Sequence, residues 1–346
     1  MAAFLIFDSP TLANRIRLDV FLVDQLGISR SRVSRLIQQG KIFVNSLSAK
    51  KAGLMLKKGE IIEIRDTLDN RDNQAIQAIQ KNQDIKDLQD IVDQIEIVAE
   101  TPEYIVVNKP AGLLVHQTKA RESDTLVSWL INHYPEIKNV GEVEMRAGLV
   151  HRLDKEASGL LVVARTQTMY DYLKKQFQAR IIEKEYLVLV NGQVNKNHDI
   201  IDFAISRGEK GKMVARPKIG VVTLRNVSAL QTGKDAKTEF WVEKRLVNLT
   251  LLTVKIHTGR MHQIRVHLYA YNHPVFGDRL YQQKKKLSKN KEKLDRLFLH
   301  ATHLCFVDLS SQKVCFDSAL PQKLKLFLES SKELSAKGRI NLGLSN

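Results

Sequence analysis

Two short segments near the N-terminus carry apolar residues at helical spacing. The apolar positions repeat at intervals of three and four residues, and they are Leu18, Phe21, Leu22 and Leu26 in the segment 17–26 and Val33, Leu36 and Ile37 in the segment 30–39. This period is typical of amphipathic helices with one buried face. Gly27 separates the segments, Gly40 follows the second, and Ser29 is placed to cap its first turn. The pattern predicts two helices joined by a tight turn.

The residues after the second helix predict a small sheet. The runs "KIFVN" at 41–45 and "GEIIEIR" at 59–65 are short, apolar and bounded by turn residues, as strands are. Together with the two helices, they give the segment 15–65 a resemblance to the S4-type RNA-binding domain, carried by "RLDVFL", "IFVN" and "KKGEIIEI". One departure is "VNS" where this domain usually has the tight turn "VNG".

Three arginines of the second helix lie outside its apolar stripe: Arg30, Arg32 and Arg35. A basic helix face is most often a solvated surface. The resemblance to the S4-type domain implies instead that Arg30, Arg32 and Arg35 bind RNA. Both interpretations are open at the level of sequence.

The chain then passes through a polar stretch into a larger domain. Residues 66–90 are rich in Asn, Gln and Asp and contain no aromatic residue, which predicts a linker. From 91 to about 330, strand-like runs such as "YIVVNKP", "GLLVVAR" and "EYLVLVNG" alternate with the helical stretches "TLVSWLINHY" and "MYDYLKKQFQ". The predicted fold class is α+β, a mainly antiparallel mixed sheet with a small α/β domain before it.

Charge and cysteine content restrict the partner and the compartment. The 346 residues carry a net charge of +16, with a sequence pI near 9.7, and so large a surplus favours a polyanion such as nucleic acid. A lysine-rich stretch at 282–296 adds to this positive charge, and it could be a solvated loop or a loop that binds phosphates.

The cysteine content restricts the compartment. Only Cys305 and Cys315 are present, so we expect no disulfide framework. No apolar run approaches the ~20 residues of a membrane span, and we expect a cytoplasmic protein without membrane contact.

The stretch "VHRLDKEASGLLVVA" at 150–164 concentrates polar residues directly before an apolar strand. Asp154 within it could simply stabilise a turn. However, "HRLDKEASGLLVVART" resembles the catalytic motif of the RluA family of RNA pseudouridine synthases, whose essential carboxylate falls on Asp154. Further segments match this family in order: "NKPAGLLVH" at 108–116, "KEYLVLVNG" at 184–192, "IDFAISR" at 201–207, "TGRMHQIRVHL" at 258–268, "HPVFGDRLY" at 273–281 and "LFLHATHLCF" at 297–306. Glu156-Ala157 replaces the usual Asp-Thr, which keeps a carboxylate but loses a hydroxyl.

The reaction that the resemblance implies explains these residue types. Isomerisation of uridine to pseudouridine breaks the glycosidic bond, turns the base and rejoins it through carbon, so we expect no cofactor. An ionised Asp154 could attack the sugar or remove a ribose proton. His116, His151 and His267 follow no zinc-binding spacing, and we expect no metal.

Other site residues are implied mainly by the resemblance. Arg265 would keep Asp154 charged, and the apolar spacing of Ile264 and Leu268 on a predicted helix places Arg265 beside the buried face. Tyr186 would stack on a flipped uracil, although a strand tyrosine is most often a core residue. The resemblance places Arg152, Lys184, Arg260 and His262 near phosphates or the flipped base.

The substrate is also inferred by resemblance. The segments 116–137 and 146–155 are most like the RluD type of the family, which acts on the interface stem-loop of large-subunit (23S) ribosomal RNA. We therefore expect a monomeric isomerase acting on this RNA. Two alternatives stay open: a transfer-RNA-directed synthase, and a non-catalytic RNA-binding factor in ribosome assembly.

Overall fold

A computed structural model describes residues 3–6, 16–26, 29–64, 89–117, 124–208, 211–216, 233–282 and 294–331. The chain divides into two compact units, residues 1–90 and 91–346, and each is described by itself. Several predicted features lie outside the described residues: most of the polar linker at 66–90, Gly27, the lysine-rich stretch at 283–293 and the side chain of Arg32.

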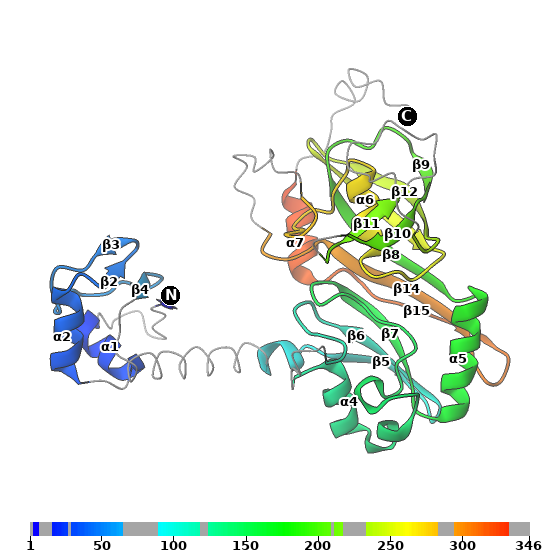
Figure 1. The fold of residues 1–346 in the computed structure, drawn as a ribbon, viewed down its shortest axis with the longest axis horizontal. Helices are drawn as coiled ribbons and strands as arrows, with labels where there is room; N and C mark the ends of the chain where they lie inside the picture. The colour runs from blue at the N-terminus through cyan, green and yellow to red at the C-terminus, as the bar shows by residue number, and fades with distance from the viewer. Residues whose placement is uncertain are drawn as a thin grey trace. The chain divides into compact units, whose positions relative to one another are not determined.

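The N-terminal unit packs two helices against a small antiparallel sheet (Figure 1). The helices are α1 (Leu18–Leu26) and α2 (Arg30–Gln38), and the strand order is β1 (Ala3–Ile6), β4 (Ile61–Ile64), β2 (Ile42–Val44), β3 (Leu47–Ser48). The predicted apolar stripes are buried, apart from the partly buried Phe21. Ser29 precedes α2 as predicted, but its hydroxyl makes no capping bond and instead contacts the Ser31 hydroxyl.

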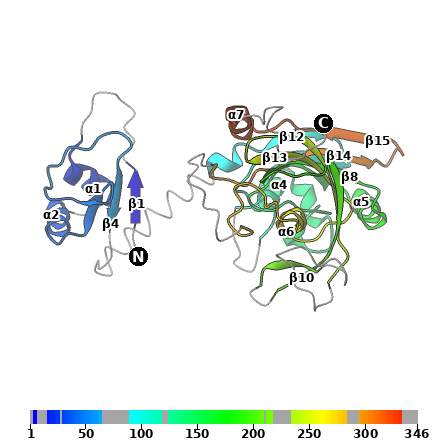
Figure 2. The same cartoon turned by 90° about the horizontal axis from the view of Figure 1, so that it is seen from above.

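The larger unit is built on one sheet of nine strands (Figures 1 and 2). The strand order is β5 (Glu96–Glu100), β6 (Tyr104–Lys109), β7 (Ser158–Ala164), β14 (Leu299–Val307), β8 (Glu183–Asn191), β13 (Leu249–Ile256), β12 (Lys237–Arg245) and β9 (His198–Asp202), with β15 (Lys313–Asp317) paired to β14. Within this sheet, among described residues, β7 and β14 pair in parallel and the other neighbours are antiparallel. The predicted α+β class is confirmed.

Helices and a separate hairpin complete this unit. They are α4 (Leu126–His133), α5 (Gln167–Ala179), α6 (Gln263–Ala270), α7 (Gln322–Ser330), the 3-10 turns Pro135–Asn139 and Glu144–Arg146, and the hairpin β10 (Ala204–Arg207) and β11 (Met213–Arg216). A capping box starts α4, because Thr125 and Ser128 exchange side-chain and backbone hydrogen bonds. None of the described helices has the length and apolar character needed to cross a bilayer.

The junction of β7 and β14 joins the two halves of the sheet. Gly159 lies there with φ +115°, and a Cβ at this position would be 2.2 Å from the carbonyl oxygen of Ala301. Only glycine allows so close an approach of two backbones. The glycine of the "ASG" run therefore lets the start of β7 pack against β14, a few residues after Asp154.

The structure contains one disulfide, in a chain for which we expected no disulfide framework. Cys305 on β14 and Cys315 on β15 are register partners and form a disulfide, with their Cα atoms 4.2 Å apart. The two cysteines are ten positions apart in the sequence and lie on the two strands of a hairpin. The apolar character of the two segments does not specify this pairing.

Candidate active site

One cavity of about 620 Å³ collects most of the predicted site residues. Its lining comes from the segment before β7, the end of α5, β8 and the loop that leads into α6. Seven of the residues predicted from the sequence line it: Asp154, Tyr186, Arg265, Arg152, Lys184, Arg260 and His262. These residues span more than a hundred positions of the sequence, from Arg152 to Arg265. The fold therefore brings residues of several separate motifs into one cavity.

Asp154 projects from a loop that is fixed on both sides. Leu153 is buried in the core before it, and the backbone N–H of Ala157 donates to the Asp154 carbonyl at 3.1 Å after it. The Asp154 side chain is 16% exposed. It is therefore held at the cavity surface, where a substrate could reach it.

Lys109 of "NKPAG" braces this loop, which sequence reasoning missed. Its fully buried ammonium donates to the backbone carbonyls of Pro110, Leu113 and Lys155 at 2.7, 2.9 and 3.3 Å. Burial lowers the pKa of Lys109 to about 7. The contact with Lys155 ties the strand-end motif to the residue that follows Asp154.

Arg265 bridges two carboxylates. Its Nη1 donates to Asp154 Oδ2 at 3.0 Å, while Nε and Nη2 donate to the two oxygens of Asp278 at 2.7 and 2.9 Å. Burial alone would lower the pKa of Arg265, but the hydrogen bonds and charge of Asp278, together with Asp154, raise it. The predicted neighbour of Asp154 is thus in place as a permanent cation. Ile264 and Leu268 face the core as predicted.

Asp278 is a second site residue that the sequence did not single out. Its buried carboxylate also accepts the backbone N–H groups of Leu280 and Tyr281 at 2.8 and 2.9 Å. The Tyr281 ring lies 5.2 Å from the Arg265 guanidinium, in the geometry of a cation–π contact. In the sequence, Gly277-Asp278 of "HPVFGDRLY" is typical of a turn. The position of Asp278 within a segment that matches the family was the signal that could have identified it.

His262 approaches Asp154 from the loop before α6. It has a left-handed backbone with φ 54°, its Nε2 is 3.9 Å from Asp154 Oδ1, and its Nδ1 is 3.0 Å from the Tyr281 hydroxyl. Burial lowers the pKa of His262, against the opposing effect of Asp154. A neutral imidazole at this distance can accept or donate a hydrogen bond to a substrate held between the two groups.

Tyr186 is both a core residue and part of the cavity wall. It lies on β8 between Val254 of β13 and Ala301 of β14, and its side chain belongs to the main hydrophobic core. Burial raises the pKa of Tyr186, and the charge of Asp154 raises it further. The ring is therefore a neutral aromatic surface beside the carboxylate.

The other basic residues that line the cavity have different contacts within the protein. Arg152 Nη1 is 3.2 Å from His116 Nε2, and Arg260 Nε donates to the Asp235 carbonyl at 2.9 Å. Lys184 Nζ lies 4.7 Å from the Phe177 ring centre, and burial lowers its pKa to about 8. A polyanion in this cavity would meet several positive groups.

The three histidines considered as metal ligands have separate surroundings. His116 contacts Arg152, His151 Nε2 accepts the Val162 N–H at 3.0 Å, and His267 contacts Thr238 and the Phe203 carbonyl. The three imidazoles therefore contact different partners in different parts of the fold, and these contacts do not bring them together as ligands of one ion.

The basic helix of the N-terminal unit is partly engaged in an ion pair. Asp19 is buried, and it accepts from Arg17 at 3.0 Å and from Arg30 at 2.8 Å. The Arg17 hydrogen bond, with help from Arg30, lowers the pKa of Asp19 to about 2. Arg30 therefore has a structural partner, whereas Arg35 lies exposed on α2.

Comparison with known proteins agrees with this geometry. Residues 103–270 match the model of the RNA pseudouridylate synthase family, and residues 16–62 match the S4 domain. An uncharacterized RNA pseudouridine synthase of Aquifex aeolicus is 38% identical over 268 residues, covering 77% of this chain and 76% of the relative. The ribosomal large subunit pseudouridine synthase D of Zymomonas mobilis is 35% identical over 241 residues, covering 68% of this chain and 72% of the relative.

Solved structures show the same fold. The human RNA pseudouridylate synthase domain containing 4 protein has a TM-score of 0.54 at 23% identity, covering 73% of this chain and 97% of that one. A second human structure, RNA pseudouridylate synthase domain containing 1, has a TM-score of 0.53 at 24% identity. It covers 72% of this chain and 95% of the human one. Motifs, fold and relatives agree that this chain belongs to the RluA-type RNA pseudouridine synthases, enzymes that isomerise uridine in RNA, and that it carries an S4 domain in its N-terminal unit.

Proposed function

We propose that this enzyme converts uridines of large-subunit (23S) ribosomal RNA to pseudouridine, with Asp154 as the essential carboxylate. The observation that carries the proposal is the position of Asp154 in the cavity, paired with Arg265 at 3.0 Å and beside the aromatic wall of Tyr186. A carboxylate that is accessible, hydrogen-bonded to an arginine and next to an aromatic surface suits this chemistry.

In the proposed mechanism a uridine leaves its stack and enters the cavity, where Tyr186 supports the uracil face. Asp154 either bonds to the ribose C1′ as the glycosidic C–N bond breaks, or removes a ribose proton to start the same cleavage. The uracil turns and its C5 bonds to C1′, as the Asp154–C1′ bond breaks on the first route or as the removed proton returns to the ribose on the second. The C5 proton is then lost while N1 gains one. No atoms are gained or lost overall.

We further propose the roles of the surrounding cations and domains. Arg152, Lys184, Arg260 and His262 would contact phosphates or the flipped base, because they line the same cavity. Residues 15–65 would bind RNA, 66–90 would link, and 91–330 would form the catalytic domain. The proposed state is a cytoplasmic monomer, since the substrate is RNA and the proposed site lies within one chain.

The substrate proposal rests on the name of the Zymomonas relative, a ribosomal large subunit pseudouridine synthase, and on the additional S4 domain of this chain. We expect a strain that lacks the gene to lose pseudouridines in the interface stem-loop of large-subunit RNA. Unstacking a uridine costs the least free energy in a loop. Carbodiimide labelling followed by primer extension across ribosomal and transfer RNA is the measurement. Loss of a transfer-RNA site with every ribosomal pseudouridine kept would overturn the substrate and leave the enzyme class intact.

The S4 domain provides a further prediction. Replacing the exposed Arg35 with glutamine should weaken RNA binding and reduce the slope of log affinity against log salt by about one, because one phosphate contact is lost. Turnover at saturating RNA should stay near wild type. Glutamine at Lys325, exposed on α7, is the matched control. An unchanged slope in the Arg35 variant would make this arginine part of a solvated face.

A further inference from the structure

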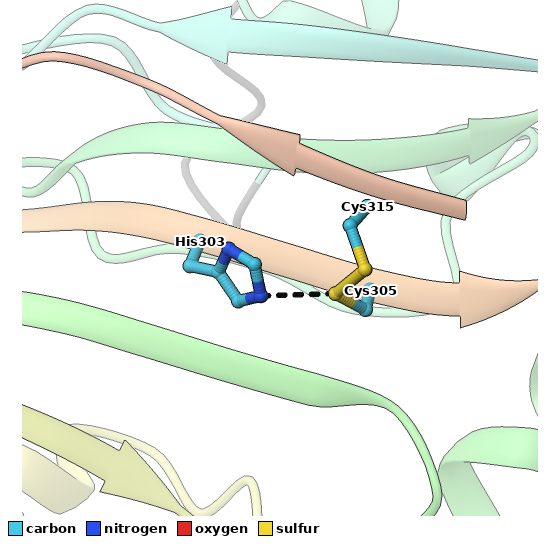
Figure 3. Close-up of side chains that lie close together, drawn as sticks. All are labelled: His303, Cys305 and Cys315. Carbon is cyan, nitrogen blue, oxygen red and sulfur yellow. Dashed lines mark hydrogen bonds between the residues drawn. A yellow bond between two sulfur atoms is a disulfide. The ribbon is translucent and has the colours of Figure 1, made fainter. Parts of the chain in front are cut away.

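A second cluster of reactive side chains lies on β14 and β15, and the mechanism does not use it. Figure 3 shows His303 and Cys305 on one strand and Cys315 on its neighbour. Their candidate ligand atoms, one imidazole nitrogen and two sulfurs, all lie within 4.8 Å of one another. In the described part of the chain, this is the group of histidine, cysteine and acidic side chains whose spacing would fit one metal ion.

The surroundings of His303 orient its ring toward the sulfurs. Asp317 Oδ1 is 2.6 Å from His303 Nδ1, so the carboxylate favours the proton on this nitrogen. The opposite nitrogen, Nε2, then presents its lone pair 2.9 Å from Cys305 Sγ. A disulfide sulfur has no proton to donate to that lone pair. The arrangement is the carboxylate–histidine pair that orients imidazole ligands in metal sites.

The cluster is separate from the active site. On β8, Lys184 and Tyr186 line the cavity, and Glu183 and Glu185 alternate with them, so these glutamates point to the other face of the sheet. Cys305 pairs in register with Glu183, and His303 pairs with Glu185. Register partners share a face, so the cluster lies on the side of the sheet away from Asp154.

We propose that the reduced form of this cluster binds one thiophilic divalent cation, Zn²⁺ in the first instance, through His303 Nε2, Cys305 Sγ and Cys315 Sγ. This set of one nitrogen and two sulfurs matches the ligand preference of Zn²⁺. Cys315 is exposed, so solvent has access to the remaining coordination position. The ion would join β15 to β14 in place of the disulfide, a structural role that does not depend on the proposed substrate.

The two forms of the cluster exclude each other chemically. Reduction adds two electrons and two protons to the disulfide and gives two thiols; a water-soluble phosphine supplies the electrons and takes an oxygen from water to become its oxide. Each thiol then loses its proton to solvent as its sulfur binds the ion. In a reducing compartment the dithiol form is favoured, so the metal-binding form is the one expected there.

The test is a titration of the full chain with Co²⁺, which replaces Zn²⁺ and reports its ligands by absorption. Protein reduced with phosphine and then freed of it should bind one Co²⁺ with a sulfur-to-cobalt charge-transfer band, and Zn²⁺ should displace the Co²⁺. Oxidised protein should show no such band. Added Zn²⁺ should also raise the melting temperature of the reduced protein only.

Three variants and a control identify the ligands. Cys315→Ser should weaken Co²⁺ binding at least about 100-fold, and Asp317→Asn about 10-fold, because the latter removes only the partner of His303. His303→Gln should shift the cobalt spectrum and weaken binding. His198→Gln is the control. His198 is also on this sheet and contacts Glu239, but it does not belong to the group of candidate ligands, so this variant should bind Co²⁺ like wild type. Lack of a charge-transfer band in the reduced protein, or equal binding by Cys315→Ser, would overturn the proposal.

Discussion

Replacing Asp154 with asparagine is expected to abolish pseudouridine formation while RNA affinity stays close to wild type. In the structure, Arg265 Nη1 lies 3.0 Å from Asp154 Oδ2. The asparagine amide keeps the size of the side chain and an oxygen that can accept this hydrogen bond, but it has no negative charge. Both attack on the sugar and removal of a ribose proton need that charge. We expect turnover to fall by at least about 10³-fold. Tritium release from RNA labelled at uracil C5 measures it directly.

The variant should remain folded, so the loss can be assigned to chemistry. Arg265 keeps both of its hydrogen bonds to Asp278, and no buried charge is left without a partner. Asp171→Asn on the exposed face of α5 is the matched control and should keep full activity. Turnover within tenfold of wild type in the Asp154 variant would show that another group carries the reaction.

Local features of the fold were predictable from the sequence. The stripes of α1 and α2 follow from contacts between residues three and four apart, and the buried strand β7 follows from a continuous apolar run. Strand order was not predictable. The parallel pairing of Ser158 with His300 joins positions 142 residues apart, and no local pattern specifies such a partner.

The active site divides in the same way. The resemblance implied Asp154, Tyr186 and Arg265 as site residues, and in the structure all three line one cavity. Asp278 and Lys109 were missed because their roles depend on how loops fold back. Asp278 acts by bonding an arginine on the preceding helix, and Lys109 acts through backbone carbonyls, which carry no signature in the sequence.

The basic helix shows why exposure on a predicted helix does not define a binding residue. Arg30, Arg32 and Arg35 are equivalent in the sequence pattern, but Arg30 bonds the buried carboxylate of Asp19 at 2.8 Å. Asp19 lies on the first helix, where its position gave no reason to expect burial. Part of the positive charge of this helix therefore stabilises the domain itself.

Arg265 is the residue whose loss should have the second largest effect. Arg265→Met leaves the carboxylates of Asp154 and the buried Asp278 without their cation, and removing one partner of a buried pair costs about 3–5 kcal/mol of the free energy of unfolding. We also expect turnover to fall at least about 10²-fold, because Asp154 loses the hydrogen bond that orients it in the cavity. Urea unfolding measures stability, and single-turnover kinetics with excess enzyme measures activity.

Arg265→Lys separates charge from geometry, which decides the question if the methionine variant unfolds. Lysine keeps a positive charge but cannot form the two parallel bonds to Asp278 and still reach Asp154 as the guanidinium does. Turnover should therefore fall well beyond any loss of RNA affinity. Arg165→Lys is the matched control, because Arg165 also bridges two carboxylates, Glu100 at 3.2 Å and Glu136 at 2.6 Å, away from the cavity. Wild-type turnover in Arg265→Lys, or a loss no larger than in Arg165→Lys, would mean that Arg265 stabilises the fold without positioning Asp154.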